Sequence, residues 1–360
     1  MTDQPLLSVD GLKTQFYAED AVVRAVDGIS FDVEPGEIVG LVGESGAGKS
    51  VAVRSIVRMI ASPGEIVAGE VTYDGLTLVG FETDGDELVP RSDTLSESAI
   101  REEVRGNEIA VVFQDPMESL NPVYTVGHQV REFIQLNRDL STADATSEAI
   151  DMLRKVGIPR PESRYDDYPH EFSGGMRQRV LIAMALGCEP RLIIADEPTT
   201  ALDVTVEGQI LDLVADVQAE FGTSFIWVTH DMGVVAEICD RVNVMYLGAI
   251  VERGTVDEIF HDTKHPYTEA LLGSIPRTDR EIETLEPIAG TMPAATDPPV
   301  GCRFHTRCPA AREACRTVDP PAIDVGEGSG HTAACIKHGD DAYEESSPIE
   351  TAATVVSQDE

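Results

Sequence analysis

Short apolar runs that end in polar residues recur along the first 260 residues. Three of them, EIVGLV (37–42), RLIIAD (191–196) and TSFIWVTH (223–230), carry consecutive apolar side chains, as strands do that are buried on both faces of a sheet. Helical patterns occur instead in VAVRSIVRMI (51–60) and SEAIDMLRKVG (147–157). Strands that alternate with helices predict a mostly parallel α/β sheet, whose ligands gather at the carboxyl ends of the strands.

The start of the chain follows a different pattern. LSVDGLKTQF (7–16), VRAVDGISFDV (23–33) and GEVTYDG (69–75) are short β-branched runs with turn residues between them, which predicts a β-rich opening. A later segment, VNVMYLGAIVERG (242–254), predicts a hairpin.

Three stretches lie outside these patterns. Residues 80–105 are acidic and rich in serine, which predicts an exposed insertion. Residues 276–300 are rich in proline and predict a linker. Residues 339–360 are acidic with few large apolar side chains, which predicts a disordered tail.

The first predicted helix follows GESGAGKS, which fits the template G-x-x-x-x-G-K-[ST]. Its glycines let the backbone turn tightly around an anion, and the backbone N–H groups with the helix N-terminus then face phosphate oxygens. Lys49 supplies a charge for the β- and γ-phosphates, and Ser50 supplies a hydroxyl for Mg²⁺. Because a strand precedes the octet and a helix follows it, we expect it to bind a nucleoside triphosphate rather than to form a plain Gly-rich turn. The expected contacts are Gly43, Glu44, Ser45, Gly46, Ala47, Gly48, Lys49 and Ser50.

A second element of this chemistry is LIIAD (192–196), in which an aspartate ends an apolar strand. A phosphate-loop ATPase needs a carboxylate near Mg²⁺, and Asp196 fits that role. Glu197 follows at once and provides a second carboxylate that can orient or deprotonate the attacking water. An acidic turn at a strand end is the alternative, but the pairing with a phosphate loop disfavours it.

FSGGMRQR (172–179) adds a second Gly-rich segment at a helix start. With this motif the chain resembles the ATP-binding subunits of ABC transporters, whose signature is usually written LSGGQ; Phe172 and Met176 replace the usual Leu and Gln. The resemblance covers about residues 5–260. It implies an α/β fold: a P-loop NTPase core of the RecA-like type, an antiparallel β subdomain and an α-helical subdomain at about 115–185.

The resemblance also implies a composite site. In the family, the signature Ser173, Gly174 and Gly175 contact the γ-phosphate held by the phosphate loop of another subunit, so that ATP joins two subunits. Asp203 belongs to the loop that contacts the dimer partner.

Three further positions match family residues with a role at the nucleotide. Gln114 matches the glutamine that reaches Mg²⁺ and the attacking water, and His230 the histidine that contacts the γ-phosphate. Phe16 matches the aromatic residue that stacks on adenine, although Tyr17 is a second candidate. Glu197, His230 and Gln114 are therefore the expected catalytic residues.

Three stretches narrow the subfamily: FQDPMESLNPVYTVGHQ (113–129), YPHEFSGGMRQR (168–179) and HPYTEALLGSIP (265–276). They resemble the oligopeptide/dipeptide/nickel import ATPases, and the third resembles their C-terminal extension, expected here at residues 261–338. The implied function is ATP hydrolysis that drives peptide import. The implied partners are two permease subunits, a second ATPase subunit and an extracellular solute-binding protein. Nickel or another small solute is the nearest alternative, and an ABC ATPase that acts without permeases is a more distant one.

Charge excludes one class of partner. The chain has 27 Lys and Arg against 64 Asp and Glu, for a net charge of −37. Nucleic-acid binding needs clustered cations and is not expected. The acidic excess predicts a salt-rich cytoplasm, in which salt screens the repulsion between like charges, so we expect a haloarchaeal source. Without a signal segment or a membrane span, we expect the protein to be peripheral to the cytoplasmic face of the membrane.

Six cysteines fall into two groups. Cys188 and Cys239 lie in apolar or mixed surroundings and predict plain core residues. The other four gather near the C-terminus, where free thiols in a cytosolic protein indicate a metal site. Their spacing differs from a zinc ribbon and suits an iron–sulfur cluster, and the subfamily extension implies [4Fe–4S]. Zinc and unligated thiols stay open as alternatives. The four are Cys302, Cys308, Cys315 and Cys335.

Overall fold

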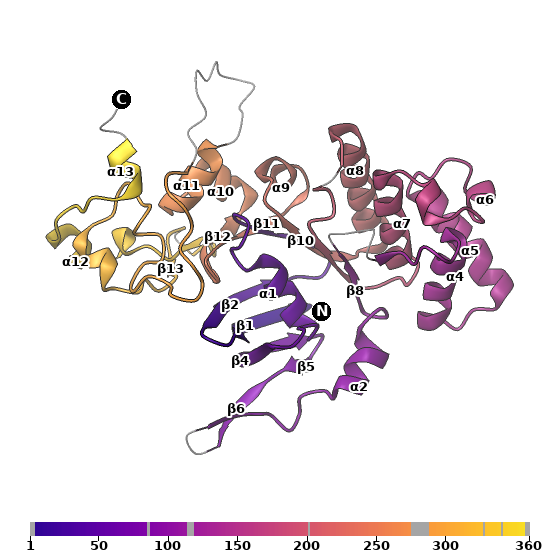
Figure 1. Ribbon diagram of the computed structural model, residues 1–360, viewed down its shortest axis with the longest axis horizontal. Helices are drawn as coiled ribbons and strands as arrows, with labels where there is room; N and C mark the ends of the chain where they lie inside the picture. The colour runs from indigo at the N-terminus through magenta and orange to yellow at the C-terminus, as the bar shows by residue number, and fades with distance from the viewer. Residues whose placement is uncertain are drawn as a thin grey trace.

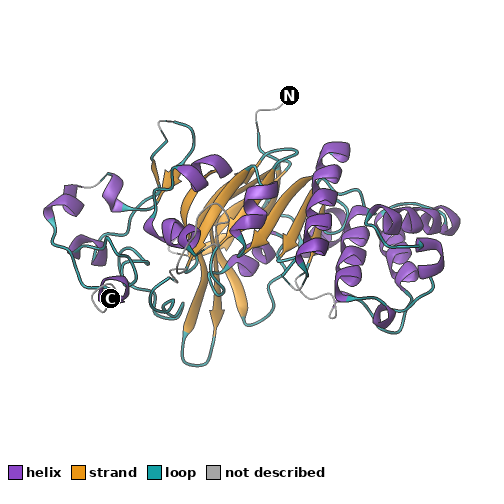
Figure 2. Cartoon of the chain, turned by 90° about the horizontal axis from the view of Figure 1, so that it is seen from above, coloured by secondary structure: helices purple, strands orange, loops and turns teal. Residues whose placement is uncertain are grey.

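The computed structural model describes residues 4–84, 87–113, 119–200, 202–274, 288–326, 328–339 and 341–356. Two sheets occupy the middle of an elongated molecule. A lobe of helices lies at one end of the molecule. The last part of the chain, residues 288–356, lies at the other end and is called the C-terminal segment below (Figures 1 and 2). The motifs at the strand ends therefore lie between the helical lobe and the C-terminal segment.

The larger sheet has strand order β13-β14-β12-β11-β3-β10-β9-β8. Its five strands from β11 to β8 are parallel, and β12, β14 and β13 add antiparallel pairs at one edge. The predicted parallel sheet and the predicted hairpin are both confirmed. The strands are β3 (Ile38–Val42), β8 (Ile109–Val112), β9 (Leu192–Asp196), β10 (Ser224–Thr229), β11 (Arg241–Tyr246), β12 (Ala249–Thr255), β13 (Ile323–Asp324) and β14 (Thr332–Ala333).

The opening of the chain forms a separate antiparallel sheet in the order β2-β1-β4-β5. Its strands are β1 (Leu7–Tyr17), β2 (Val22–Val33), β4 (Gly64–Tyr73) and β5 (Leu76–Val79). Helix α1 (Lys49–Ile56) buries Ala52, Val53 and Ile56 in the same apolar cluster as residues of this sheet and of β3. This packing holds the phosphate loop between the two sheets.

The expectation of an exposed insertion at residues 80–105 is only partly right. A hairpin of β6 (Phe81–Asp84) and β7 (Glu87–Pro90) projects from the molecule (Figure 1). The next residues form α2 (Glu97–Ala99) and η1 (Ile100–Val104), in which Ile100 and Val104 are fully buried. Two apolar side chains amid acidic neighbours are enough to anchor the end of the segment to the core.

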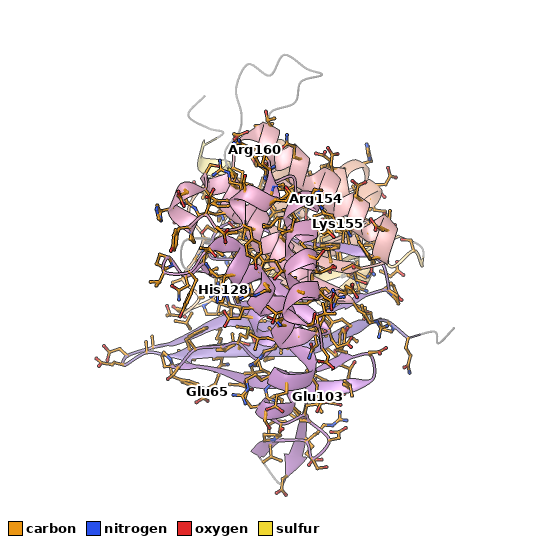
Figure 3. All side chains as sticks on the ribbon, turned by 90° about the vertical axis from the view of Figure 1, so that its right-hand side faces the viewer. Glu65, Glu103, His128, Arg154, Lys155 and Arg160 are labelled. Carbon is orange, nitrogen blue, oxygen red and sulfur yellow. The ribbon has the colours of Figure 1, made fainter. Side chains whose placement is uncertain are left out.

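The helical lobe packs α4, α5 and α7 against one another, and Figure 3 views it end-on. Arg154 and Lys155 close helix α5, where cations oppose the partial negative charge of the last carbonyls. The lobe consists of α4 (Val126–Asn137), α5 (Thr142–Lys155), α6 (Pro161–Arg164), η2 (Pro169–Glu171) and α7 (Gly174–Leu186).

The polypeptide after the signature helix returns to the central sheet and then forms the C-terminal segment. Its helices are α8 (Val204–Phe221), α9 (Met232–Ile238), α10 (Val256–His261), α11 (Pro266–Gly273), η3 (Glu313–Arg316), η4 (Ile336–His338), α12 (Asp341–Glu345) and α13 (Ala352–Val356). None of the helices in the described part of the chain is long and apolar enough to cross a membrane.

The expectation of a disordered tail from residue 339 is wrong for residues 341–356. Tyr343 is buried, and its hydroxyl donates to the carbonyl of Ala310 at 2.9 Å. Arg312 donates to the carbonyls of Tyr343, Glu344 and Ser346. The acidic composition concealed one aromatic anchor and one arginine that satisfies three carbonyls.

Candidate nucleotide site and its surroundings

The phosphate loop joins β3 to α1. It contains three glycines with positive φ, and at two of them, Gly43 and Gly48, the backbone also lies against a neighbouring strand. Gly43, Gly46 and Gly48 have φ of 153°, 85° and 102°, which L side chains rarely adopt. A Cβ on Gly43 would lie 2.2 Å from the carbonyl oxygen of Met245, and one on Gly48 would lie 2.1 Å from that of Ala25. The loop therefore passes too close to two strands to accept any other residue at these positions.

Lys49 lies under the loop and is almost completely buried. Its ammonium donates to the carbonyls of Gly43 at 2.8 Å and Glu44 at 3.2 Å, and lies 3.5 Å from a carboxylate oxygen of Glu197. Burial lowers the pKa of Lys49, and the charge of Glu197 opposes that shift. The lysine is held by groups of its own chain beside the position where phosphate oxygens are expected.

Ser50 and Asp196 form a hydrogen-bonded pair of oxygen-bearing side chains. The Ser50 hydroxyl donates to Asp196 Oδ1 at 2.7 Å, and Arg54 contacts Oδ2 at 3.3 Å. Asp196 is fully buried at the end of β9, and burial raises the pKa of its carboxyl while Ser50 and Arg54 oppose the shift. A hydroxyl beside a carboxylate is the donor set that Mg²⁺ prefers.

Glu197 turns toward the same place because its backbone is left-handed, with φ of 49°. Its N–H donates to the carbonyl of Val228 at 3.0 Å, which fixes the turn against β10. One carboxylate oxygen accepts from Thr200 Oγ1 at 3.0 Å and lies 3.5 Å from Nδ1 of His230. The carboxylate and the imidazole, which follow β9 and β10, thus meet the ammonium from the start of α1.

These groups line one cavity of about 1080 Å³. Val23 and Ala25 of β2 form part of its wall, and so do residues from the C-terminal segment. The sequence motifs gave no sign of this second contribution. The lining residues from beyond α10 are Leu271, Ser274, Ile288, Gly290, Thr291, Met292, Ala295 and Arg307.

Phe16 and the alternative Tyr17, the residues expected to stack on adenine, are not part of this lining. Phe16 packs its ring against Gly64, where an added Cβ would lie 2.5 Å from the ring. The strand partner of Phe16, Val23, lines the cavity in its place, and Tyr17 is exposed beyond it. Gln114 lies outside the described residues.

The signature residues lie at the start of α7, and Asp203 lies at the start of α8. Neither helix start lines the cavity. Ser173 caps α7 by accepting from the N–H of Met176 at 3.3 Å, and Asp203 caps α8 by accepting from that of Val206 at 3.0 Å. A Cβ on Gly175 would lie 2.8 Å from the side chain of Val206, so glycine lets the two helix starts approach closely. Ser173 and Gly174 are exposed. The structure does not bring these residues to the phosphate loop of the same chain.

The four C-terminal cysteines line one small cavity together with His265 and His305. Burial raises the pKa of Cys302 and Cys308 to about 12, and it also raises the pKa of Cys335. Within the described ranges, no three His, Cys, Asp or Glu side chains are grouped so as to hold one metal ion. Cys188 and Cys239 are buried elsewhere in the core, as predicted.

Family models match two parts of the chain. Residues 26–200 match the ABC transporter family, and residues 251–315 match the C-terminal region of oligopeptide/dipeptide transporters. The second match begins in β12 and includes three of the four clustered cysteines.

Relatives match almost the whole chain. A probable peptide ABC transporter ATP-binding protein of Sinorhizobium fredii is 48% identical over 92% of this chain and 94% of its own length. The oligopeptide transport ATP-binding protein AppD of Bacillus subtilis is 44% identical, with 95% and 99% covered. The dipeptide transport ATP-binding protein DppD of Escherichia coli is 44% identical, with 90% and 94% covered.

Solved structures show the same cassette fold. CbiO1 of Clostridium perfringens, part of an ABC transporter complex, matches with TM-score 0.58 and 28% identity, over 72% of this chain and 93% of that one. A dimeric bacterial ABC transporter cassette matches with TM-score 0.59 and 25% identity, over 69% and 98%. Since relatives above 40% identity cover nearly the full length, the chain belongs to the ATP-binding subunits of ABC transporters, in the oligopeptide/dipeptide group.

Proposed function

We propose that this chain binds Mg²⁺-ATP in the cavity beside the phosphate loop and hydrolyses it to drive import of di- or oligopeptides. The observation that carries the proposal is the meeting of Lys49, Glu197 and His230 on one cavity. Peptide import is supported by the transporters named among the relatives and by the match to the oligopeptide/dipeptide C-terminal region.

The proposed chemistry divides among these side chains. Lys49 and the loop N–H groups bind the β- and γ-phosphates, and Ser50 with Asp196 holds Mg²⁺. Glu197 accepts a proton from the attacking water, and His230 orients that water or the γ-phosphate. Fixed donors around the phosphates stabilise the charge of the transition state.

The remaining assignments are proposals of the same kind. Ser173, Gly174, Gly175 and Asp203 complete the site of a second ATPase subunit, which fits their position at two helix starts, where Ser173, Gly174 and Asp203 are exposed. Gln114 contacts Mg²⁺ and the water. The adenine end of the site is formed on β2 by Val23, which Phe16 supports as its strand partner.

The decisive experiment is Glu197→Gln. A general base contributes about 10²–10⁴-fold, so hydrolysis should fall by about 10³-fold while ATP binding stays within a few-fold of the unchanged chain. Binding is measured with a fluorescent ATP analogue and hydrolysis by phosphate release. Glu207→Gln, in the first turn of α8, is the matched control. Turnover near that of the unchanged chain would reject Glu197 as the base.

Partners and location follow from the same proposal. Two permease subunits form the transport path, a paralogous ATPase pairs with this chain, and an extracellular binding protein delivers the solute. The chain then lies on the cytoplasmic face of the membrane. Reconstitution with the permeases and the binding protein should give peptide-stimulated hydrolysis, and stimulation by Ni²⁺ in place of peptide would reject the solute assignment.

We also propose three parts: an ATP-binding domain at 5–260, an extension at 261–338 and a short acidic tail at 339–360. The extension would hold a [4Fe–4S] cluster through Cys302, Cys308, Cys315 and Cys335. The support for this proposal is that the four free thiols line one cavity and that their irregular spacing suits cluster ligation. Within the described residues, no three His, Cys, Asp or Glu side chains are grouped so as to hold one metal ion. When bound, the cluster supplies cross-links between segments far apart in the sequence.

Iron and sulfide analysis of anaerobically purified protein tests the cluster. About four irons per chain with broad absorbance near 400 nm are expected. Stoichiometric zinc without iron would reject it. A halophilic source is supported only by the net charge of −37, and unfolding of the protein on removal of molar salt would test it.

A further inference from the structure

Arg307 of the C-terminal segment reaches the phosphate loop from 263 residues away. Its two terminal nitrogens bond the two carboxylate oxygens of Glu44 at 2.6 and 3.1 Å. Glu44 is the second residue of the loop, and its own N–H donates to the hydroxyl of Tyr267 at 2.8 Å. Two side chains from later parts of the chain therefore bond to the phosphate loop: Tyr267 of α11 and Arg307 of the C-terminal segment.

The arginine itself has a fixed position. Only 3% of it is exposed, and its Nε donates to the carbonyl of Ala289 at 2.8 Å. Its guanidinium lies 5.9 Å from the ring centroid of Tyr246 and 6.0 Å from that of Phe304. These contacts join the phosphate loop to the wall of the cavity near Ile288 and Gly290.

The charge balance of the cavity gives this contact a role. Glu44 lines the cavity and is 29% exposed, so its carboxylate lies on the surface that faces the bound anion. A carboxylate beside phosphates repels them unless a cation compensates it. Bidentate pairing by an almost buried guanidinium provides that compensation and also fixes the geometry.

We propose that Arg307 is a positioning residue of the nucleotide site: it neutralises Glu44 and holds the phosphate loop and the cavity wall together for ATP. The C-terminal segment is then part of the ATP site. This inference rests on the proposed function, because it assigns a role in binding the ATP of that same cavity.

The test compares full-length Arg307→Met, Glu44→Gln and the double variant. Removing the cation alone leaves an uncompensated carboxylate, so Arg307→Met should weaken ATP binding and raise KM by about tenfold, the effect of one charge-assisted hydrogen bond. The kcat should change by less than about twofold, because the catalytic groups lie elsewhere in the cavity. Glu44→Gln in the Arg307→Met background should restore affinity to within about threefold of the unchanged chain, because it removes the repelling charge.

Arg316→Met is the matched control, since Arg316 is half exposed and pairs with Glu313 outside the cavity. Thermal melting of each variant identifies loss of folding. A Kd for ATP unchanged in Arg307→Met, or a double variant as weak as the single one, would overturn the proposal. If Lys49→Met abolishes binding but Arg307→Met does not, the proposed function stands without this role. If the unchanged chain binds no ATP, both fail.

Discussion

The phosphate loop and the signature segment are both Gly-rich turns at helix starts, yet the fold treats them in opposite ways. The phosphate loop is wedged between two strands, and its lysine is buried among partners of the same chain. The signature residues Ser173 and Gly174 are exposed. The Ser173 hydroxyl accepts a hydrogen bond from the N–H of Met176, within the same helix. One half is assembled within the chain, whereas the other presents its donors outward.

The two Gly-rich segments also differ in the kind of group that they offer to an anion. Beside the phosphate loop lie the charged groups of Lys49 and Asp196. Burial lowers the pKa of Lys49 and raises that of Asp196, and such shifts are typical of functional sites. The exposed half carries no ionisable group at Ser173–Gly175 and relies on helix N–H groups. Such a surface fits the proposed role of completing the ATP site of a second subunit.

The largest expected effect is on the buried half. Lys49→Met should weaken ATP binding by about 100-fold, because a buried charge contact to phosphate is lost and Glu197 loses its cation. A titration with a fluorescent ATP analogue measures it. Lys155→Met, which is partly exposed and pairs with Glu220, is the control and should bind normally. Equal loss in both variants would show that folding, not the site, is affected.

The next effect tests the exposed half. Ser173→Arg should leave ATP binding by the isolated chain within about twofold but lower hydrolysis by about 50-fold, because the long side chain blocks the proposed contact of this helix start with the nucleotide of a second subunit. Ser141→Arg provides the matched control, since Ser141 caps α5 with the same geometry. If ATP binding and hydrolysis fell together in Ser173→Arg, the two halves would not be separable as described.

The smallest effect concerns stability. Burial raises the pKa of Asp196 above its unfolded value, so its ionisation weakens the fold as pH rises through that raised pKa. Asp196→Asn should therefore raise the free energy of unfolding of the nucleotide-free chain by roughly 1 kcal/mol at neutral pH, with the gain vanishing in acid. Denaturant unfolding at several pH values measures it, with exposed Asp257→Asn as the control. A gain independent of pH would contradict this cause.

Sequence patterns predicted the strands and the loop that carry the nucleotide motifs, because each lies within a short stretch of sequence. Strand ends at Asp196 and His230 and the loop before α1 follow from apolar runs and glycine spacing. The same patterns were only partly right at residues 80–105 and wrong for residues 341–356, where Ile100 and Tyr343 are isolated apolar anchors in acidic surroundings. Composition averages over a window, but a single buried side chain can fix a segment.

The order of residues alone was sufficient for the family, the ATP chemistry and the parallel core, since each depends on neighbours within a few positions. The pairing of Arg307 with Glu44, the wall at Ile288–Ala295 and the shared cavity of four cysteines come from packing between distant segments. No local pattern encodes which far residue fills a given space. That depends on how the sheets and the C-terminal segment dock, and so on the three-dimensional fold.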